Sequence, residues 1–326
     1  MIFFKIVKND KTFFSNFGQE FDENHFNHLK VRIFVKKIPK GEIVLFGTDY
    51  DYKLLANKHI AEKTAEVCEV FFREIINIKQ QEYSILSHNF ITNQSLMQDA
   101  IERVVPEKSL ARAENHIEQI EIVKNIIDTD KQGTAESFLT IVKSANDMQA
   151  QLEGLKILNR DFKLDLGSHN IKTALENIIH PFYKEFRRRE IKLHWGIDHA
   201  ESQIRLIKID YKILYVAIHH FFNNVIKYIQ PYSHLNINFD HDNKKLEFQM
   251  ISAKIDEDEL ERIFIFGYRG KNVKEKDAGE GIGMYMVSQA LNLINAKMIV
   301  SPDYSTEHVD ASGDKYVLNK FTIQFA

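Results

Sequence analysis

The sequence contains very little cysteine, and it lacks long hydrophobic runs. One cysteine, Cys68, occurs in 326 residues, which excludes an internal disulfide framework and fits a reducing compartment. No apolar run approaches the roughly 18 residues that a membrane-spanning helix needs. The opening segment, MIFFKIVKNDKTFF, has too short an apolar core for a signal peptide. We therefore expect a cytoplasmic protein with no transmembrane segment.

An excess of charge of either sign is missing as well. The chain carries 43 Lys and Arg residues against 46 Asp and Glu residues. Such a balance creates no overall field that would attract nucleic acid, so we expect no nucleic-acid partner. The chain is longer than the roughly 250–300 residues at which a single core stops growing. Two or three domains are therefore expected.

Three regions of the chain differ in their residue pattern. Residues 1–55 alternate short β-type runs with turn signals, which predicts a small β-containing input domain, although no motif reveals what signal it receives. Residues 56–160 place apolar residues at helical spacing, which predicts a long antiparallel helical hairpin. Residues 161–326 alternate helical and strand-like patterns, which predicts an α/β sandwich. The expected fold class is therefore α+β and multidomain.

The helical hairpin is expected to turn at the segment VVPEKS, residues 104–109. Its arms carry an apolar side that one chain leaves uncovered, so two chains are expected to pair into a four-helix bundle. His88 lies off the apolar stripe of the first arm, and Thr92 shares its exposed face four residues further on. Exposed histidines on helices are common, so this pair alone does not establish a chemical role.

The segment HHFFNNVIKYI predicts an amphipathic helix with one polar face. His220, Asn224 and Lys227 fall together on that face, at spacings of four and three residues. An asparagine oxygen is a hard ligand for Mg²⁺, and a lysine ammonium attracts phosphate. The alternative is a polar helix side that faces water.

The segment GEGIGMYMV places three glycines at the start of another predicted helix. The unpaired N–H groups of a helix start bind anions, and the missing Cβ atoms let a phosphate approach closely. The preceding loop, residues 271–278, carries three lysines that are expected to close over phosphates. A GxGxG pattern by itself is weak, because it lacks the lysine and hydroxyl residue of a Walker A loop.

The order of these segments resembles the GHKL type of ATP-binding domain, and more closely the catalytic domain of sensor histidine kinases. The resemblance covers roughly residues 163–326 and matches the N box, the F box and the second glycine box of that family. It implies that the domain binds ATP and Mg²⁺, with Asn224 as the Mg²⁺ ligand. The nucleotide-site residues that it implies are His220, Asn224, Lys227, Tyr228, Phe264, Arg269, Gly279, Gly281 and Gly283.

The helical hairpin resembles the dimerisation and phosphoacceptor domain of the same family. His88 is then the phosphoacceptor, and Thr92 occupies the place of a residue that orients water for dephosphorylation of the partner regulator. Asn89 stands where many of these kinases carry an acid that assists proton removal. The resemblance implies a homodimer that autophosphorylates on His88 with ATP and transfers the phosphoryl group to an aspartate of a response regulator.

The first glycine box departs from the family pattern. Met250 stands where an aspartate bonds the adenine amino group, and Ser252 and Lys254 occupy glycine positions. A hydrogen bond to a charged group contributes about 1.5–3 kcal/mol, so its loss weakens adenine binding by roughly 10- to 150-fold. The alternative function is therefore a pseudokinase or phosphotransfer scaffold with weak or no ATP binding.

His220 separates this chain from the ATPases that share the fold. Those proteins place a glutamate at this position, where it activates water for hydrolysis. An imidazole is poorly suited to that role, which argues against net ATP hydrolysis as the main activity. A third alternative, an ATP-driven conformational clamp, is disfavoured for the same reason.

Overall fold

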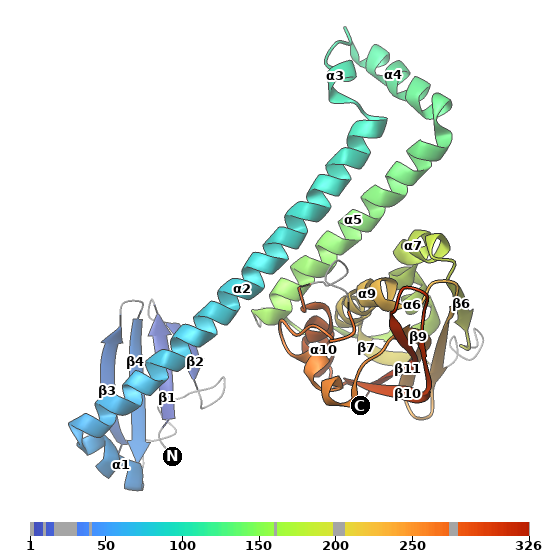
Figure 1. The fold of residues 1–326 in the computed structure, drawn as a ribbon. Helices are drawn as coiled ribbons and strands as arrows, with labels where there is room; N and C mark the ends of the chain where they lie inside the picture. The colour runs from blue at the N-terminus through green and yellow to red at the C-terminus, as the bar shows by residue number, and fades with distance from the viewer. Residues whose placement is uncertain are drawn as a thin grey trace. The chain divides into compact units, whose positions relative to one another are not determined.

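The computed structural model describes residues 3–8, 11–15, 31–38, 41–159, 162–197, 206–273 and 280–325. They belong to two compact units, Met1–Ser84 and Ile85–Ala326, which divide within one long helix (Figure 1). No helix in these ranges is long and apolar enough to cross a bilayer. Our division of the chain into domains 1–55, 56–160 and 161–326 stays a prediction.

The first unit contains a four-stranded antiparallel sheet in the order β2-β1-β4-β3. A small core of aliphatic side chains, with Ile43 and Leu45 fully buried, packs between this sheet and the following helices. Cys68 belongs to this core, and burial raises the pKa of its thiol. The elements are β1 (Phe3–Lys8), β2 (Lys11–Ser15), β3 (Val31–Ile38), β4 (Gly41–Thr48), α1 (Asp49–Ala56) and the first part of α2 (Lys58–Val104).

The predicted hairpin turn coincides with the C-terminal end of helix α2. Pro106 follows and precedes a short helix, α3 (Glu107–Leu110), so the chain reverses through α3 and α4 (His116–Thr129), as Figure 1 shows. The return arm is not one bent helix. It is interrupted at Asp130, whose side chain accepts a hydrogen bond of 2.8 Å from the Gly133 N–H and starts α5 (Lys131–Leu158).

The second unit also holds a five-stranded sheet in the order β10-β11-β9-β8-β6. All its neighbours are antiparallel except β6 and β8. A separate two-stranded sheet pairs β5 with β7. The strands are β5 (Leu166–His169), β6 (Lys192–Trp195), β7 (Ile207–Asp210), β8 (His234–Asp240), β9 (Lys245–Ala253), β10 (Lys297–Val309) and β11 (Lys315–Gln324).

One face of the five-stranded sheet is covered by helices, which makes this part an α/β sandwich (Figure 1). Burial alternates along β9, so Phe248 and Met250 point toward the helices. Phe221 and Phe222 of α9 pack against Phe248, with ring centroids 4.9 and 5.7 Å away. The helical elements are α6 (Ile171–Ile179), η2 (His180–Phe182), α7 (Tyr183–Arg188), α9 (Tyr211–Tyr228), η3 (Glu257–Glu259), η4 (Arg262–Phe264) and α10 (Gly283–Leu293).

The expected fold class is confirmed. The described residues form a small β-containing part, long helices and an α/β sandwich. The pairing of two hairpins into a four-helix bundle stays a prediction.

The sandwich core gives a first prediction about stability. Leu214 in α9 is fully buried, so Leu214→Ala is expected to lower the free energy of unfolding by about 2–5 kcal/mol. Leu206 is 53% exposed, and Leu206→Ala is expected to cost less than about 0.5 kcal/mol. Trp195, the single tryptophan, lies in β6, so its fluorescence in a urea titration follows this domain. Equal midpoints for the two variants would contradict the described core.

Candidate functional site

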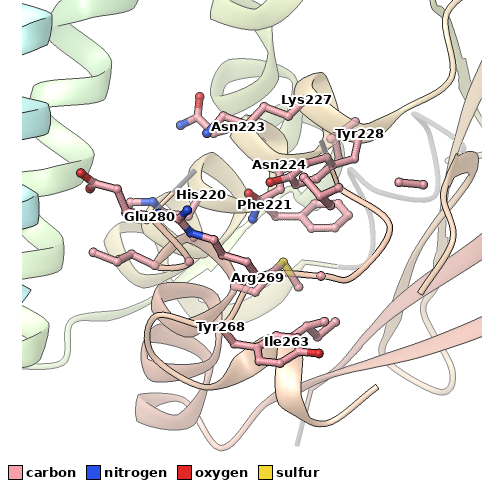
Figure 2. A pocket seen from close by; sticks show the side chains of 18 of the residues that line it. His220, Phe221, Asn223, Asn224, Lys227, Tyr228, Ile263, Tyr268, Arg269 and Glu280 are labelled. Atoms are coloured by element: carbon pink, nitrogen blue, oxygen red, sulfur yellow. The ribbon is translucent and has the colours of Figure 1, made fainter. Parts of the chain in front are cut away.

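The candidate site is a cavity of about 560 Å³ in the second unit. Its walls come from α2, α5, α9, the end of β9, the segment after η4 and the start of α10. Figure 2 shows Lys227 and Tyr228 of α9 on one side and Ile263 and Tyr268 on the other, with Asn224 between them. The sequence-predicted residues that line the cavity are His88, Asn89, Thr92, His220, Asn224, Lys227, Tyr228, Arg269, Gly281 and Gly283.

Of the remaining predicted site residues, one is described away from the cavity lining and one is not described. Phe264 does not line the cavity but is half-buried and packs against the hydrophobic core. Gly279 lies outside the described residues, as do Lys274 and Lys276 of the predicted lysine loop. Lys271, at the start of that loop, pairs with Asp258 at 2.7 Å.

Helix α9 presents the polar face that the sequence predicted. Its N-terminus is capped by Asp210, whose Oδ1 accepts hydrogen bonds of 2.9 and 3.2 Å from the N–H groups of Lys212 and Ile213. Most other side chains of the helix are buried, so the helix cannot turn about its axis without exposing its core. This packing holds Asn224 in the cavity wall. Its Nδ2 is buried and has no hydrogen-bond partner among the described residues.

Gly283 is the first residue of α10, and it lies directly against Asn224. A Cβ atom added there would lie 2.5 Å from Asn224 Nδ2 and 2.9 Å from Asn224 Oδ1. The cap residue of the helix, Ile282, supplies no side-chain hydrogen bond to the first turn. The N–H groups of this turn therefore lie beside the Asn224 carboxamide, in a position to meet an anion.

Gly281 also lies in close contact with another segment of the backbone. Its φ is +73°, and a Cβ atom would lie 2.5 Å from the carbonyl carbon of Gly267. The Gly267 N–H donates a hydrogen bond of 3.1 Å to the Gly281 carbonyl. The segment that carries Arg269 is thus joined by its backbone to the glycine loop, and only glycine fits position 281.

Sequence reasoning missed Glu259, which organises that segment. It is fully buried, and its Oε1 accepts hydrogen bonds of 2.8 Å from the Tyr268 hydroxyl and the Lys271 N–H. Its Oε2 accepts a third, of 3.0 Å, from the Asp256 N–H. Because the partners lie up to 12 residues away, local periodicity gives no signal for this role.

Burial lowers the pKa of two side chains of α9, His220 and Lys227. Burial, and then the neighbouring His219, lower the pKa of His220 to about 3. Burial also lowers the pKa of Lys227, while the Glu280 carboxylate partly offsets this decrease. His220 is therefore uncharged near pH 7 and would not repel a cation placed beside Asn224.

A partly buried cluster of Lys143, Asp147 and His219 joins α9 to α5 and was also missed. Asp147 Oδ1 lies 2.7 Å from His219 Nε2 and 2.5 Å from Lys143 Nζ. Burial alone would raise the pKa of Asp147, but the hydrogen bond from His219 and the charge of Lys143 outweigh it and keep the pKa below its usual value. Lys143 also donates to Asn223 Oδ1 at 3.3 Å. The Lys-x-x-x-Asp spacing in α5 is the only sequence signal of this cluster.

The α2 wall of the cavity carries the predicted phosphoacceptor residues. The His88 side chain is 73% exposed, and its Nδ1 lies 4.0 Å from Glu280 Oε1. Asn89 Nδ2 donates a hydrogen bond of 3.4 Å to Glu280 Oε2. The Thr92 hydroxyl donates to the His88 carbonyl at 3.0 Å. Glu280 is the third acidic residue, after Glu259 and Asp147, that sequence reasoning did not include.

At the opposite end of the cavity, the lining positions 250, 252 and 254 carry Met, Ser and Lys and offer no carboxylate. Met250 is 3% exposed and pairs in register with Asn319 of β11. Ser252 Oγ accepts a hydrogen bond of 2.9 Å from Asn319 Nδ2. Lys254 Nζ forms an ion pair of 2.8 Å with Glu307, so it is not a free cation. In the part of the chain that the structure describes, no group of three or more His, Cys, Asp or Glu residues is arranged to hold a metal ion.

Comparisons with known proteins support the resemblance. No family model matches the chain. The sensor histidine kinase YxdK of Bacillus subtilis (strain 168) is 26% identical over 152 residues, which are 45% of this chain and 44% of the relative. The chain thus spans less than half of that relative's length. This similarity confirms the resemblance to sensor histidine kinases.

Solved structures of histidine kinases are also similar to this chain, at low scores. The catalytic domain of ThkA has a TM-score of 0.39 at 14% identity, covering 50% of this chain and 97% of that domain. Full-length ShkA in complex with AMPPNP has a TM-score of 0.41 at 13% identity, covering 76% of this chain and 46% of ShkA. ThkA in complex with the response regulator TrrA has a TM-score of 0.38 at 13% identity, covering 100% of this chain and 79% of that chain.

The lowered pKa of His220 gives a prediction about acid stability. An unfolded histidine titrates near pH 6.5, so between about pH 6.5 and 3 the unfolded chain binds more protons than the folded one. The free energy of unfolding must therefore fall as the pH falls, by up to about 1.4 kcal/mol per pH unit from this residue. Between pH 6.5 and 5, the wild type is expected to lose about 2 kcal/mol through His220 alone.

Urea titrations followed by Trp195 fluorescence at several pH values test this expectation. His220→Gln should show a smaller loss of stability on acidification than the wild type. His180→Gln, which changes an exposed histidine of the same unit, should behave like the wild type. Identical pH slopes for all three proteins would mean that His220 takes up a proton in the folded state.

Proposed function

We propose that this protein is a histidine kinase of the two-component type, which moves a phosphoryl group from ATP to His88 and then to an aspartate of a response regulator. The observation that carries the proposal is the composition of one cavity. It combines an exposed histidine on α2 with Asn224 and the glycine loop, which are suited to a metal-bound polyphosphate. A cytoplasmic location fits a protein that uses ATP.

The residues at the α9 end of the cavity fit the phosphates of a nucleotide. Asn224 and Lys227 supply a hard oxygen ligand and a cation, and Gly281 and Gly283 leave room beside the backbone. Arg269 adds a second cation to the lining. Mg²⁺ would neutralise charge on the phosphates, with Asn224 as its protein ligand.

Phosphoryl transfer to His88 requires a neutral imidazole that is open to the γ-phosphate. The His88 side chain is 73% exposed and is therefore open to a phosphoryl donor. In a second step, the aspartate of a response regulator takes the phosphoryl group from His88. Thr92, on the same face of α2, would assist the hydrolytic reaction on that partner.

A homodimer completes this proposal. The hairpin helices leave large apolar side chains in solvent, which a second hairpin would cover in a four-helix bundle. In the second unit, the exposed large apolar residues of α2 and α5 are Ile91, Leu96, Ile101, Phe138, Leu139, Val142 and Leu152.

A scaffold with little or no nucleotide turnover is the second candidate. It is favoured by the adenine end of the cavity, where the buried Met250 offers no charged acceptor to an amino group and Ser252 is engaged with Asn319. Such a protein would keep the hairpin and the regulator-docking surface but bind ATP at millimolar concentrations or not at all.

Labelling with radioactive ATP and Mg²⁺ tests the kinase. The wild type is expected to acquire an acid-labile, base-stable label, and His88→Ala is expected to lose it. His59→Ala changes another exposed histidine of α2 and should keep the label. Equal labelling of the wild type and His88→Ala would exclude His88 as the acceptor.

Calorimetric titration with ATP and Mg²⁺ separates the two candidates. A kinase is expected to bind ATP with a dissociation constant below about 1 mM, and Asn224→Ala should weaken this binding at least tenfold, because the Mg²⁺ ligand is lost. Asn292→Ala, at an exposed position of α10, serves as the control. A wild type that binds no ATP in this range would favour the scaffold.

A further inference from the structure

Glu280 lies in the glycine segment, directly before Gly281, and its carboxylate contacts His88 and Asn89 on the α2 wall of the cavity. One oxygen, Oε1, lies 4.0 Å from His88 Nδ1. The other, Oε2, accepts a hydrogen bond of 3.4 Å from Asn89 Nδ2. The two oxygens thus contact two neighbouring residues, His88 and Asn89, which lie at least 191 positions earlier in the sequence.

A carboxylate beside Nδ1 determines which nitrogen of His88 is nucleophilic. A neutral imidazole carries one proton, and an anion next to Nδ1 stabilises the tautomer with the proton on that atom. The lone pair then lies on Nε2. Since the His88 side chain is 73% exposed, Nε2 is accessible to a phosphoryl donor.

Position 89 is unable to receive the proton that the reaction releases, because an amide is not a base. The Asn89 side chain instead donates a hydrogen bond to Glu280 and so helps to orient its carboxylate. The Lys227 ammonium also interacts electrostatically with Glu280 from the α9 side. These contacts hold an acid next to His88 although the α2 helix itself provides none there.

We propose that Glu280 positions His88 and accepts its Nδ1 proton during phosphoryl transfer. The inference rests on the proposed function. Nε2 of His88 attacks the γ-phosphorus, and the bond from phosphorus to the bridging oxygen breaks with its electron pair leaving on ADP. The Nδ1 proton moves to the Glu280 carboxylate, so the phosphorylated ring is left neutral. The 4.0 Å separation closes to hydrogen-bond distance in the reacting complex, as acid–base contacts commonly do.

The first test compares initial rates of His88 labelling at several ATP concentrations. Glu280→Gln is expected to lower kcat about 100-fold, the usual scale of general acid–base assistance, and to change KM less than about threefold. Glu121→Gln, at an exposed glutamate of α4 that pairs with Lys124, should leave both constants unchanged. An unchanged kcat, or a loss confined to KM, overturns the proposal while labelling of His88 still supports the kinase.

The second test moves the acid onto α2. If Glu280 supplies the base that position 89 lacks, Asn89→Glu in the Glu280→Gln protein should restore kcat to within about tenfold of the wild type. A double variant that stays as slow as Glu280→Gln overturns the inference, because a merely structural contact would not be repaired by a carboxylate at position 89.

The third test uses phosphoramidate, a small phosphoryl donor, so that it does not depend on ATP. The wild type is expected to form the Nε2-phosphorylated isomer of His88, which ³¹P NMR distinguishes from the Nδ1 isomer. Glu280→Gln should react more slowly and form a larger share of the Nδ1 isomer. If ATP leaves no label but these results hold, the proposed kinase fails and the role of Glu280 stands. Equal rates and equal isomer ratios overturn the role of Glu280.

Discussion

The close approach of α10 to the Asn224 side chain is the constraint on which the candidate site depends. A Cβ atom at Gly283 would displace the Asn224 carboxamide, so the glycine at this position keeps that carboxamide in its place between the two helices. The rest of α9 is fixed by burial, and the Asp147 cluster joins it to α5. The polar face of α9, the first turn of α10 and the hairpin helix are therefore positioned by one set of contacts.

The two ends of the cavity differ in how their polar groups are hydrogen-bonded. At the α9 end, Asn224 has a buried polar atom without a partner among the described residues, which is costly unless a ligand or solvent satisfies it. At the β9 end, Ser252 Oγ accepts a hydrogen bond from Asn319 Nδ2 and Lys254 pairs with Glu307, while the buried Asn319 Oδ1 has no hydrogen-bond partner among the described residues. The Ser252 hydroxyl and the Lys254 ammonium are thus engaged at the β9 end, whereas the Asn224 Nδ2 at the α9 end is not.

Local sequence patterns predicted the features that depend on residue spacing within one helix or strand. The face of α9 with Asn224 follows from a spacing of three and four residues, and the sandwich class follows from alternating strand and helix patterns. The residues that escaped prediction, Glu259, Asp147 and Glu280, act through partners far away in the sequence. The sequence analysis did not predict the break at Asp130, where the aspartate side chain accepts a hydrogen bond from the Gly133 N–H and caps α5. Phe264 was assigned by alignment to a motif, while its packing is decided by the tertiary core.

Glu280 lies one residue before Gly281, so one short segment lines the cavity and also contacts His88. The segment that would close around the phosphates also brings the carboxylate to the histidine, so neither arrives without the other. Under the proposed mechanism, the reactivity of His88 would depend on the same segment that shapes the phosphate end of the cavity. Displacing Gly281 would leave His88 without its carboxylate partner, so the kinase would be switched off without any separate inhibitory element.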